Sequence, residues 1–226
     1  MGKSKELAEL GQVVSQSGGN VGIGADSPTE ALHIAKAFPA VKLDNIDAGG
    51  HSWRIASGST NSGFAGKLQI YNEDTSTIAA YIDASGRVTM PYQPYFHASG
   101  TLGGTTVSTG ILSFTDVYRN IGNHYNSSTS LFTAPVSGNY FVSAGLLTYP
   151  TADTNEKTLS ISINGNTEYR YGFQRSKNIS QTSREFSRVI YLSAGDYIGV
   201  HYETTGATTW VYTDNWHGHF TGYLLG

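Results

Sequence analysis

The sequence predicts an all-β protein in two parts, a thin β-rich module followed by a larger head. Three observations predict this class. Strand-forming β-branched and aromatic residues, including 15 Tyr, are abundant, and 27 Gly supply turns between strands. Apolar residues two positions apart recur along the chain, which is the period of a strand with one buried face. Good helix formers become sparse after residue 40.

Charge and composition exclude several function classes. The net charge is -3 and 14% of residues are charged, without the clusters of Lys and Arg that bind nucleic acid. No apolar run approaches the ~18–20 residues of a membrane span, so no membrane insertion is expected. Cysteine is absent, which excludes disulfides, thiolate zinc sites and cysteine catalysis. An extracellular β-protein without disulfides needs another source of stability, and oligomerisation is one.

The N-terminal segment 1–18 predicts the one convincing helix. Over residues 3–17, Leu7, Leu10 and Val14 follow the three-four spacing of a heptad seam. Two interpretations stay open, a frayed amphipathic helix and a short helical clasp at the start of a trimer. The segment lacks the apolar core of a secretory signal, so the chain is expected in the cytosol or outside the cell by a signal-free route such as virion release.

Residues 19–91 predict a β-rich module of short strands. Its apolar pairs are Val21/Ile23, Leu32/Ile34, Val41/Leu43, Trp53/Ile55, Leu68/Ile70, Ala80/Ile82 and Val88/Met90. Ser27-Pro28-Thr29-Glu30 predicts one helical turn, because Ser27 can cap it and Glu30 can complete a capping box. Two apolar residues per strand make a thin core for a module of this length. Three copies that share one core about a common axis would solve this, so the module is predicted to be an intertwined trimeric shaft.

The segment Met90-Pro91-Tyr92-Gln93-Pro94 predicts a semi-rigid junction, because neither proline has an N–H to give to a sheet. The head is predicted over residues 92–226, with one continuous β pattern over residues 95–226. Leu159-Ser160-Ile161-Ser162-Ile163 alternates and meets Asn164-Gly165, the strongest short hairpin signal. Many strands about 8–12 residues apart predict a sandwich or a barrel for the head.

Several ordered motifs of the head are shared with a known family. They are Tyr95-Phe96-His97-Ala98, His124-Tyr125-Asn126, the stretch Leu131–Phe141, the turn Ala194-Gly195-Asp196 and the ending Phe220–Leu225. In this order they resemble the globular heads of complement-1q-like proteins. The resemblance implies a ten-stranded jelly roll of the tumour-necrosis-factor-like type, assembled as a tight homotrimer.

Short motifs upstream resemble phage tail-fibre and virion-appendage sequences. They are Gly19–Gly24 with Ser27-Pro28, Leu32-His33-Ile34, and Ile82–Val88. The resemblance implies a distal, receptor-binding tail-fibre protein at the tip of the fibre. Its expected partners are a host surface glycan or outer-membrane protein, and other tail or baseplate proteins through the N-terminus. The alternatives are a structural domain that trimerises or caps a fibre, and a tail depolymerase, for which no acidic pair stands out.

His217-Gly218-His219 is the sharpest candidate site. In a strand, residues two apart share a face, so both histidines are expected opposite the core residues Phe220 and Leu224. The terminal strand of the resembled fold lies near the threefold axis, where three chains would gather their imidazoles. Such a set suits a divalent transition metal. Alternatively, these are ordinary histidines at the interface or rim. Calcium is a weaker hypothesis, because no spacing matches a calcium loop.

Aromatic residues in expected loops are the candidate receptor contacts. The terminal strand is expected to descend from the apex of the head to its base, which puts Thr213-Asp214-Asn215-Trp216 at the exposed tip. Aromatic rings bring large contact area at low entropy cost. The candidate receptor-binding residues are Tyr149, Tyr169, Tyr171, Arg175, Trp210, Asp214 and Trp216. The alternative is that most of these aromatic residues pack in the core or in the trimer interface.

Overall fold

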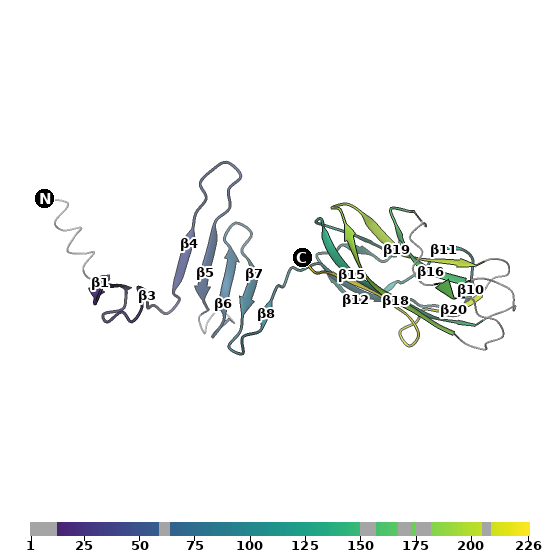
Figure 1. The fold of residues 1–226 in the computed structure, drawn as a ribbon, viewed down its shortest axis with the longest axis horizontal. Coiled ribbons are helices and arrows are strands. Elements are labelled where there is room, and N and C mark those ends of the chain that lie inside the picture. Colours follow the sequence, from purple (N-terminus) through teal and green to yellow (C-terminus); the bar gives the residue numbers. More distant parts are fainter. Residues whose placement is uncertain (1–12, 59–63, 150–156, 167–172, 175–181, 205–208) are drawn as a thin grey trace. The chain divides into compact units, whose positions relative to one another are not determined.

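The computed structural model describes residues 13–58, 64–149, 157–166, 173–174, 182–204 and 209–226 (Figure 1). The chain divides into two compact units, unit 1 (Met1–Pro91) and unit 2 (Tyr92–Gly226). All helical or strand structure in the described residues is β, which confirms the predicted fold class. No helix in this part of the chain is long and apolar enough to cross a membrane.

A three-stranded sheet opens the described part of unit 1. β1 (Val14–Ser17) and β2 (Asn20–Ile23) form an antiparallel hairpin, and β3 (Leu32–Ile34) pairs with β2 in parallel. Gly18 and Gly19 make the turn with φ of 60° and 88°, as two-residue hairpin turns favour. The helix predicted over residues 3–17 is therefore wrong at Val14–Ser17, and its residues 3–12 lie outside the described part of the chain.

The helical turn predicted at Ser27–Glu30 is also wrong. The segment crosses from β2 to β3 without helical structure, and the Pro28 carbonyl accepts a hydrogen bond from Asn20 Nδ2 at 3.2 Å. The Val21 N–H donates to the Ala31 carbonyl at 3.0 Å. These bonds tie the crossing segment to the hairpin, so tertiary contacts override the local capping signal.

The second sheet of unit 1 is an antiparallel meander whose strands pair in chain order. Its strands are β4 (Ala40–Leu43), β5 (Trp53–Ser57), β6 (Leu68–Asn72), β7 (Thr77–Ile82) and β8 (Val88–Thr89). Together with β2 and β3, they account for every apolar pair that predicted a strand in residues 19–91, with Met90 one residue beyond β8. The division between the units falls within the junction 90–94.

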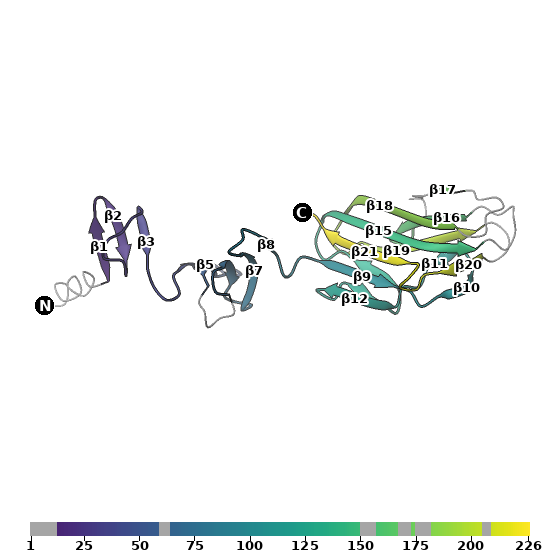
Figure 2. The same ribbon diagram turned by 90° about the horizontal axis from the view of Figure 1, so that it is seen from below.

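Unit 2 contains a seven-stranded and a six-stranded sheet. Figures 1 and 2 show the two sheets packed face to face as a sandwich. The seven-stranded sheet contains β9 (Tyr95–Ser99), β10 (Gly103–Val107), β12 (Asp116–Ile121), β15 (Gly138–Tyr149), β18 (Thr182–Leu192), β20 (Thr209–Tyr212) and β21 (His219–Leu224). The six-stranded sheet contains β11 (Gly110–Ile111), β13 (Tyr125–Asn126), β14 (Leu131–Thr133), β16 (Lys157–Ile163), β17 (Phe173–Gln174) and β19 (Tyr197–Thr204).

Strands distant in sequence are neighbours in both sheets of unit 2. The seven-stranded sheet runs β10-β20-β15-β21-β9-β12, with β18 on the other edge of β15. The six-stranded sheet runs β13-β14-β19-β16-β17, with β11 beside β19. This crossing pattern is that of a jelly roll. The described residues of unit 2 hold thirteen strands, three more than the ten expected.

The core of unit 2 lies between the two sheets and is built on stacked aromatic rings. Phe96 stacks on Tyr125 and Phe132 with centroids 4.9 and 4.7 Å away, and it meets the edge of Phe220 at 4.7 Å. All four side chains are buried. Phe96 and Phe220 come from the neighbouring strands β9 and β21, so this cluster ties the last strand of the chain to the opposite sheet.

The predicted hairpin turn at Asn164-Gly165 is confirmed. Both residues have positive φ, 52° and 76°, and Ile163 pairs with Asn166 across the turn. Asn164 also donates from Nδ2 to Asp196 Oδ1 at 2.7 Å, which joins this turn to the one before β19.

Replacement of Phe220 by Ala should destabilise the folded head by about 3–5 kcal/mol, because it opens a cavity among stacked rings. Equilibrium denaturation at a fixed protein concentration measures this. The exposed Val136→Ala is the control and should change stability by no more than about 0.5 kcal/mol. Equal losses in the two variants would contradict the described core.

Candidate functional site

The outward face of the seven-stranded sheet carries an uncovered apolar patch. Alternation along β21 turns Phe220 into the core and Tyr223 outward, as the sequence predicted. Tyr223 lies opposite Phe141 of β15, with ring centroids 5.3 Å apart. Phe141 in turn lies opposite Val189 of β18, and Val189 and Tyr191 are 55% and 65% exposed. We call Phe141, Val189, Tyr191 and Tyr223 the apolar patch.

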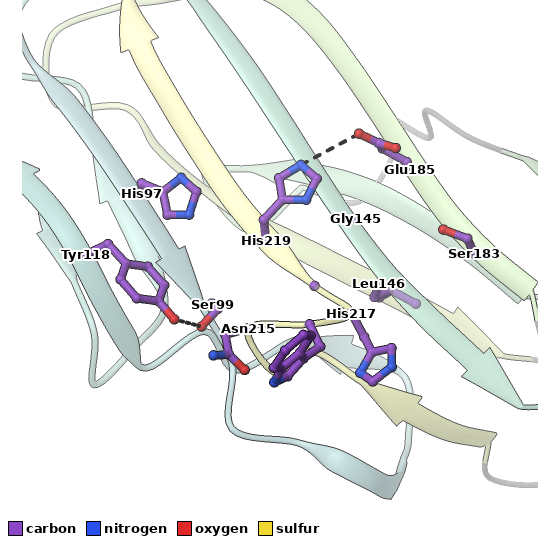
Figure 3. Close-up of a pocket in the computed structure, with 12 residues that line it drawn as sticks. His97, Ser99, Tyr118, Gly145, Leu146, Ser183, Glu185, Asn215, His217 and His219 are labelled. Atoms are coloured by element: carbon purple, nitrogen blue, oxygen red, sulfur yellow. Dashed lines mark hydrogen bonds and ion pairs between the residues drawn. The ribbon is translucent and has the colours of Figure 1, made fainter.

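A cavity of about 610 Å³ opens farther along β15 (Figure 3). Its lining comes from five strands, β9, β12, β15, β18 and β21, and from the turn between β20 and β21. The side chains used below are His97 of β9, Tyr118 of β12, Glu185 of β18, His219 of β21, and Trp216 and His217 of the turn. Three imidazoles, two aromatic rings and one carboxylate therefore face one cavity.

The side chain of Asp214 shapes the turn that carries Trp216. Its Oδ1 accepts hydrogen bonds from the Trp216 N–H at 3.1 Å and from His217 Nδ1 at 2.7 Å. Its carbonyl accepts from the N–H groups of His217 and Gly218 at 3.0 and 2.8 Å. A Cβ at Gly218 would lie 2.6 Å from Thr213 Cα, so the turn closes only with glycine there. The result is a well-bonded turn that displays an indole ring 85% exposed to solvent.

The predicted position of this turn at the exposed tip of the head is wrong. β20 pairs with Leu147–Tyr149 of β15, whereas β21 pairs with Tyr140–Gly145. The two strands thus follow one edge of β15 in the same direction, and residues 213–218 form an excursion between them. Figure 1 shows this excursion projecting from the middle of unit 2. The strand predicted from His217 is interrupted because Asp214 bonds the chain into a turn.

The two histidines of the predicted metal site do not share a strand face. β21 begins at His219, and the ring of His217 packs on Tyr212 at 5.3 Å. His219 Nε2 lies 3.0 Å from Ser143 Oγ and 3.9 Å from Glu185 Oε1. Figure 3 shows the two imidazoles pointing in different directions.

Metal binding by these histidines stays a prediction. In the described part of the single chain, no three His, Cys, Asp or Glu residues are grouped so that they could hold a metal ion. The predicted transition-metal site draws His217 and His219 from three chains, so the single chain does not test it. Calcium binding, the weaker hypothesis, likewise stays a prediction.

Burial lowers the pKa of His219 below its ordinary value. His97 lowers this pKa further, whereas Glu185 raises it. Burial dominates because the neutral imidazole loses less hydration than the cation. The ring therefore stays neutral near pH 7.

The remaining predicted receptor residues lie elsewhere. Trp210 lies opposite Tyr149, and the Tyr149 ring contacts Tyr212 at 5.1 Å. These residues are at the end of unit 2 away from the C-terminus, and the Trp210 side chain is exposed (Figure 2). Tyr169, Tyr171 and Arg175 lie outside the described residues.

Sequence reasoning missed His97, Tyr118 and Glu185 as lining residues of the cavity. Tyr118 and Glu185 lie on strands without a motif of their own, and the motif that contains His97 indicated the family but no site. Strand alternation places His97 on the outward face, but only the pairing of β9 with β21 and of β18 with β15 brings these side chains together.

A C1q domain model matches residues 96–225, which is more than half of the chain. The chain belongs to the C1q domain family. This confirms the resemblance of the head to complement-1q-like heads. C1q and related tumour-necrosis-factor-like domains typically form homotrimers and bind ligands or receptors, and their homologues are non-enzymatic signalling or structural proteins.

Solved structures similar to this C1q domain include three animal proteins. The globular domain of zebrafish complement 1qA is 13% identical, with 59% of this chain and 98% of that chain covered and a TM-score of 0.47. Eiger, a TNF from S. frugiperda, is 17% identical, with coverage of 59% and 93% and a TM-score of 0.46. Murine APRIL is 12% identical, with coverage of 59% and 99% and a TM-score of 0.45. A comparison with curated protein sequences gives no match.

We expect the His219 imidazole of this C1q domain to titrate below its ordinary pKa of about 6.5. Glu185→Gln should lower the pKa further, because the carboxylate raises it, and His97→Asn should raise it. NMR of the imidazole C–H signals against pH measures all three. An identical His219 pKa in the three proteins would contradict the described geometry.

The same shift sets the sign of a pH effect on stability. The fold favours neutral His219, so its contribution is complete above the unfolded pKa of about 6.5 and is lost as the pH falls through the lower folded pKa. Below pH about 6.5, the free energy of unfolding of wild type should therefore fall more steeply with decreasing pH than that of His219→Gln. Denaturation curves at several pH values measure this. The same pH dependence in both proteins would contradict the lowered pKa.

Proposed function

We propose that the chain is the receptor-binding protein of a phage tail fibre, which acts as a homotrimer and attaches the virion to a bacterial surface glycan. Membership of the C1q family supports the trimeric binding part of this proposal. The short motifs of residues 19–91 that resemble tail-fibre sequences support the phage part. In this proposal the protein resides at the fibre tip of the virion, and its N-terminus joins other tail or baseplate proteins.

The observation that carries the proposal is the uncovered outward face of the seven-stranded sheet. Soluble monomers rarely leave large contiguous apolar areas in water, and such areas mark interaction sites. This face holds the apolar patch together with Trp216, which a bonded turn presents to solvent. Rigid exposed aromatic side chains are typical hot spots of protein interfaces. The face therefore suits contact with further copies of the chain.

The far end of unit 2 suits the receptor. There Trp210 lies opposite Tyr149, on the same outward face as the apolar patch but at the other end of β15, and leaves its indole exposed. Aromatic faces suit the apolar C–H faces of sugar rings, and the rings lose little entropy on binding. A trimer presents three such sites, so weak contacts with a repeated glycan combine into firm attachment. An outer-membrane protein as receptor is the alternative ligand.

The uncovered face also fits a second candidate function, a structural domain that only trimerises or caps the fibre. That role needs the assembly surface but no receptor site. Cleavage of the glycan is less well supported. Glycoside hydrolysis uses two carboxylates, and among the described residues that line the cavity only Glu185 is acidic.

Two tryptophan variants separate assembly from receptor binding. Trp216→Ala should shift sedimentation from trimer towards single chain, because it removes an interface anchor. Trp210→Ala should leave the trimer intact and weaken competition with phage on susceptible bacteria by about tenfold or more. Each variant is the control for the other. A wild-type protein that sediments as a single chain would contradict the proposal.

A trimer that neither binds nor competes on any susceptible host would favour the structural role. Release of new reducing ends from host polysaccharide would instead favour a depolymerase.

A further inference from the structure

The β4–β8 sheet of unit 1 carries aliphatic side chains in register across its whole width on one face. Ile55 lies opposite Val41 on one side and Ile70 on the other, and Ile70 lies opposite Ala80. A second row joins Leu68, Ile82 and Val88. We call the set the aliphatic face, and its members are Val41, Leu43, Ile55, Leu68, Ile70, Ala80, Ile82 and Val88.

The aliphatic face is uncovered in the single chain. Its Val, Leu and Ile side chains are 39–61% exposed. They are the residues whose spacing predicted strands with one buried face, yet nothing in the described residues buries them. An uncovered apolar surface that crosses five strands marks an interface.

The opposite face of the same sheet is closed and carries charge. The Arg54 guanidinium lies 4.9 Å from the Phe38 ring and 4.4 Å from the Tyr71 ring, and it pairs with Glu73 at 2.9 Å. Lys67 lies over Phe64 in the same way, at 4.7 Å. The sheet therefore has one face with charged groups suited to water and one face of exposed aliphatic side chains.

We propose that the aliphatic face packs against the same face of two further copies of this chain, with the aliphatic faces inward and the Arg54 faces outward. The inference rests on the homotrimer of the proposed function. β8 ends at Thr89 and unit 2 begins at Tyr92, so a trimeric head holds three copies of the sheet on short tethers. Such tethering raises the local concentration of each copy to about the millimolar range.

The side chains of the aliphatic face favour another copy of this chain as its binding partner. All of its members are uncharged hydrocarbon side chains, so they offer no group for a glycan, a phosphate or an ionic partner. An occupant must itself be an apolar surface, and the identical face of another copy meets this need. A threefold arrangement lets each aliphatic face contact two others and leaves none in water.

A matched pair of isoleucine variants tests the inference in the full chain. Ile55→Glu places a charge at the centre of the aliphatic face, whereas Ile46→Glu places it on a side chain that is 94% exposed between β4 and β5. Amide hydrogen exchange in β5 and β6 should accelerate by about tenfold or more in Ile55→Glu and stay unchanged in Ile46→Glu. Equal exchange in both variants would overturn the inference.

A thiol probe keeps the test decisive if Ile55→Glu fails to fold. The chain has no cysteine, so Ile70→Cys and Ile46→Cys each add one thiol per copy. Cys at position 70 should react with a soluble disulfide reagent about tenfold or more slowly than Cys at position 46, and a short bismaleimide should link copies through position 70. Equal reaction rates in a protein that sediments as a trimer would overturn this inference and leave the proposed function standing.

Two other outcomes separate the proposals. A wild-type mass of one chain would overturn the proposed homotrimer, and this inference would fall with it. The thiol at position 70 could also be protected only when lipid vesicles are added, or only in a complex with a different protein. The occupant of the aliphatic face would then be the lipid or that protein, and not a second copy of the chain.

Discussion

The register between β15 and β21 decides what each face of the head can do. Phe220 pairs with Ala144 and His219 pairs with Gly145, so one side chain enters the core and the next faces the cavity. A slip of one residue would reverse every side chain of β21. Gly222 helps to hold this register, because a Cβ there would lie 2.8 Å from Phe96 and 3.1 Å from the Phe141 carbonyl oxygen. Core stability and surface chemistry in the head therefore depend on one strand pairing.

In both units, one face of a sheet is covered by other side chains and the opposite face carries exposed apolar residues. In the head, the aromatic cluster around Phe96 fills the space between the sheets, while the apolar patch stays uncovered. In unit 1, Arg54 and its aromatic neighbours close one side of the β4–β8 sheet, while the aliphatic face stays uncovered. A chain without disulfides has few other sources of stability, and burial between copies would supply one in each unit.

Local alternation made much of the fold predictable from the sequence. The apolar pairs located β2 to β8, and Asn164-Gly165 located a turn, because these signals depend on neighbouring residues alone. The helix prediction was wrong at Val14–Ser17. Gly18 and Gly19 allow a hairpin turn there, so the last residues of the heptad pattern form a strand. The prediction that Trp216 lies at the tip of the head was wrong, because pairing with a distant strand, β15, determines where β20 ends and β21 begins.

The candidate site was less predictable than the fold. The sequence pattern singled out His217 and His219 because they are two positions apart in an expected strand, and Trp216 because it is an aromatic residue in an expected loop. His97, Tyr118 and Glu185 join them only through sheet pairings between distant segments, and no single sequence reports such pairings. Strand periodicity also could not predict the role of Asp214. Its side-chain hydrogen bonds turn the chain, and the two histidines are separated as a result.

The interrupted strand has a consequence for how this protein can vary. Thr213 and Gly218, the ends of the excursion, lie against each other, and β20 and β21 keep separate stretches of β15 as partners. Segments of different length and sequence can therefore replace residues 214–217 without a change in either ladder. The excursion is therefore a position on the side of the sheet where sequence change alters the surface, and with it the assembly contact proposed for Trp216, while both ladders stay the same.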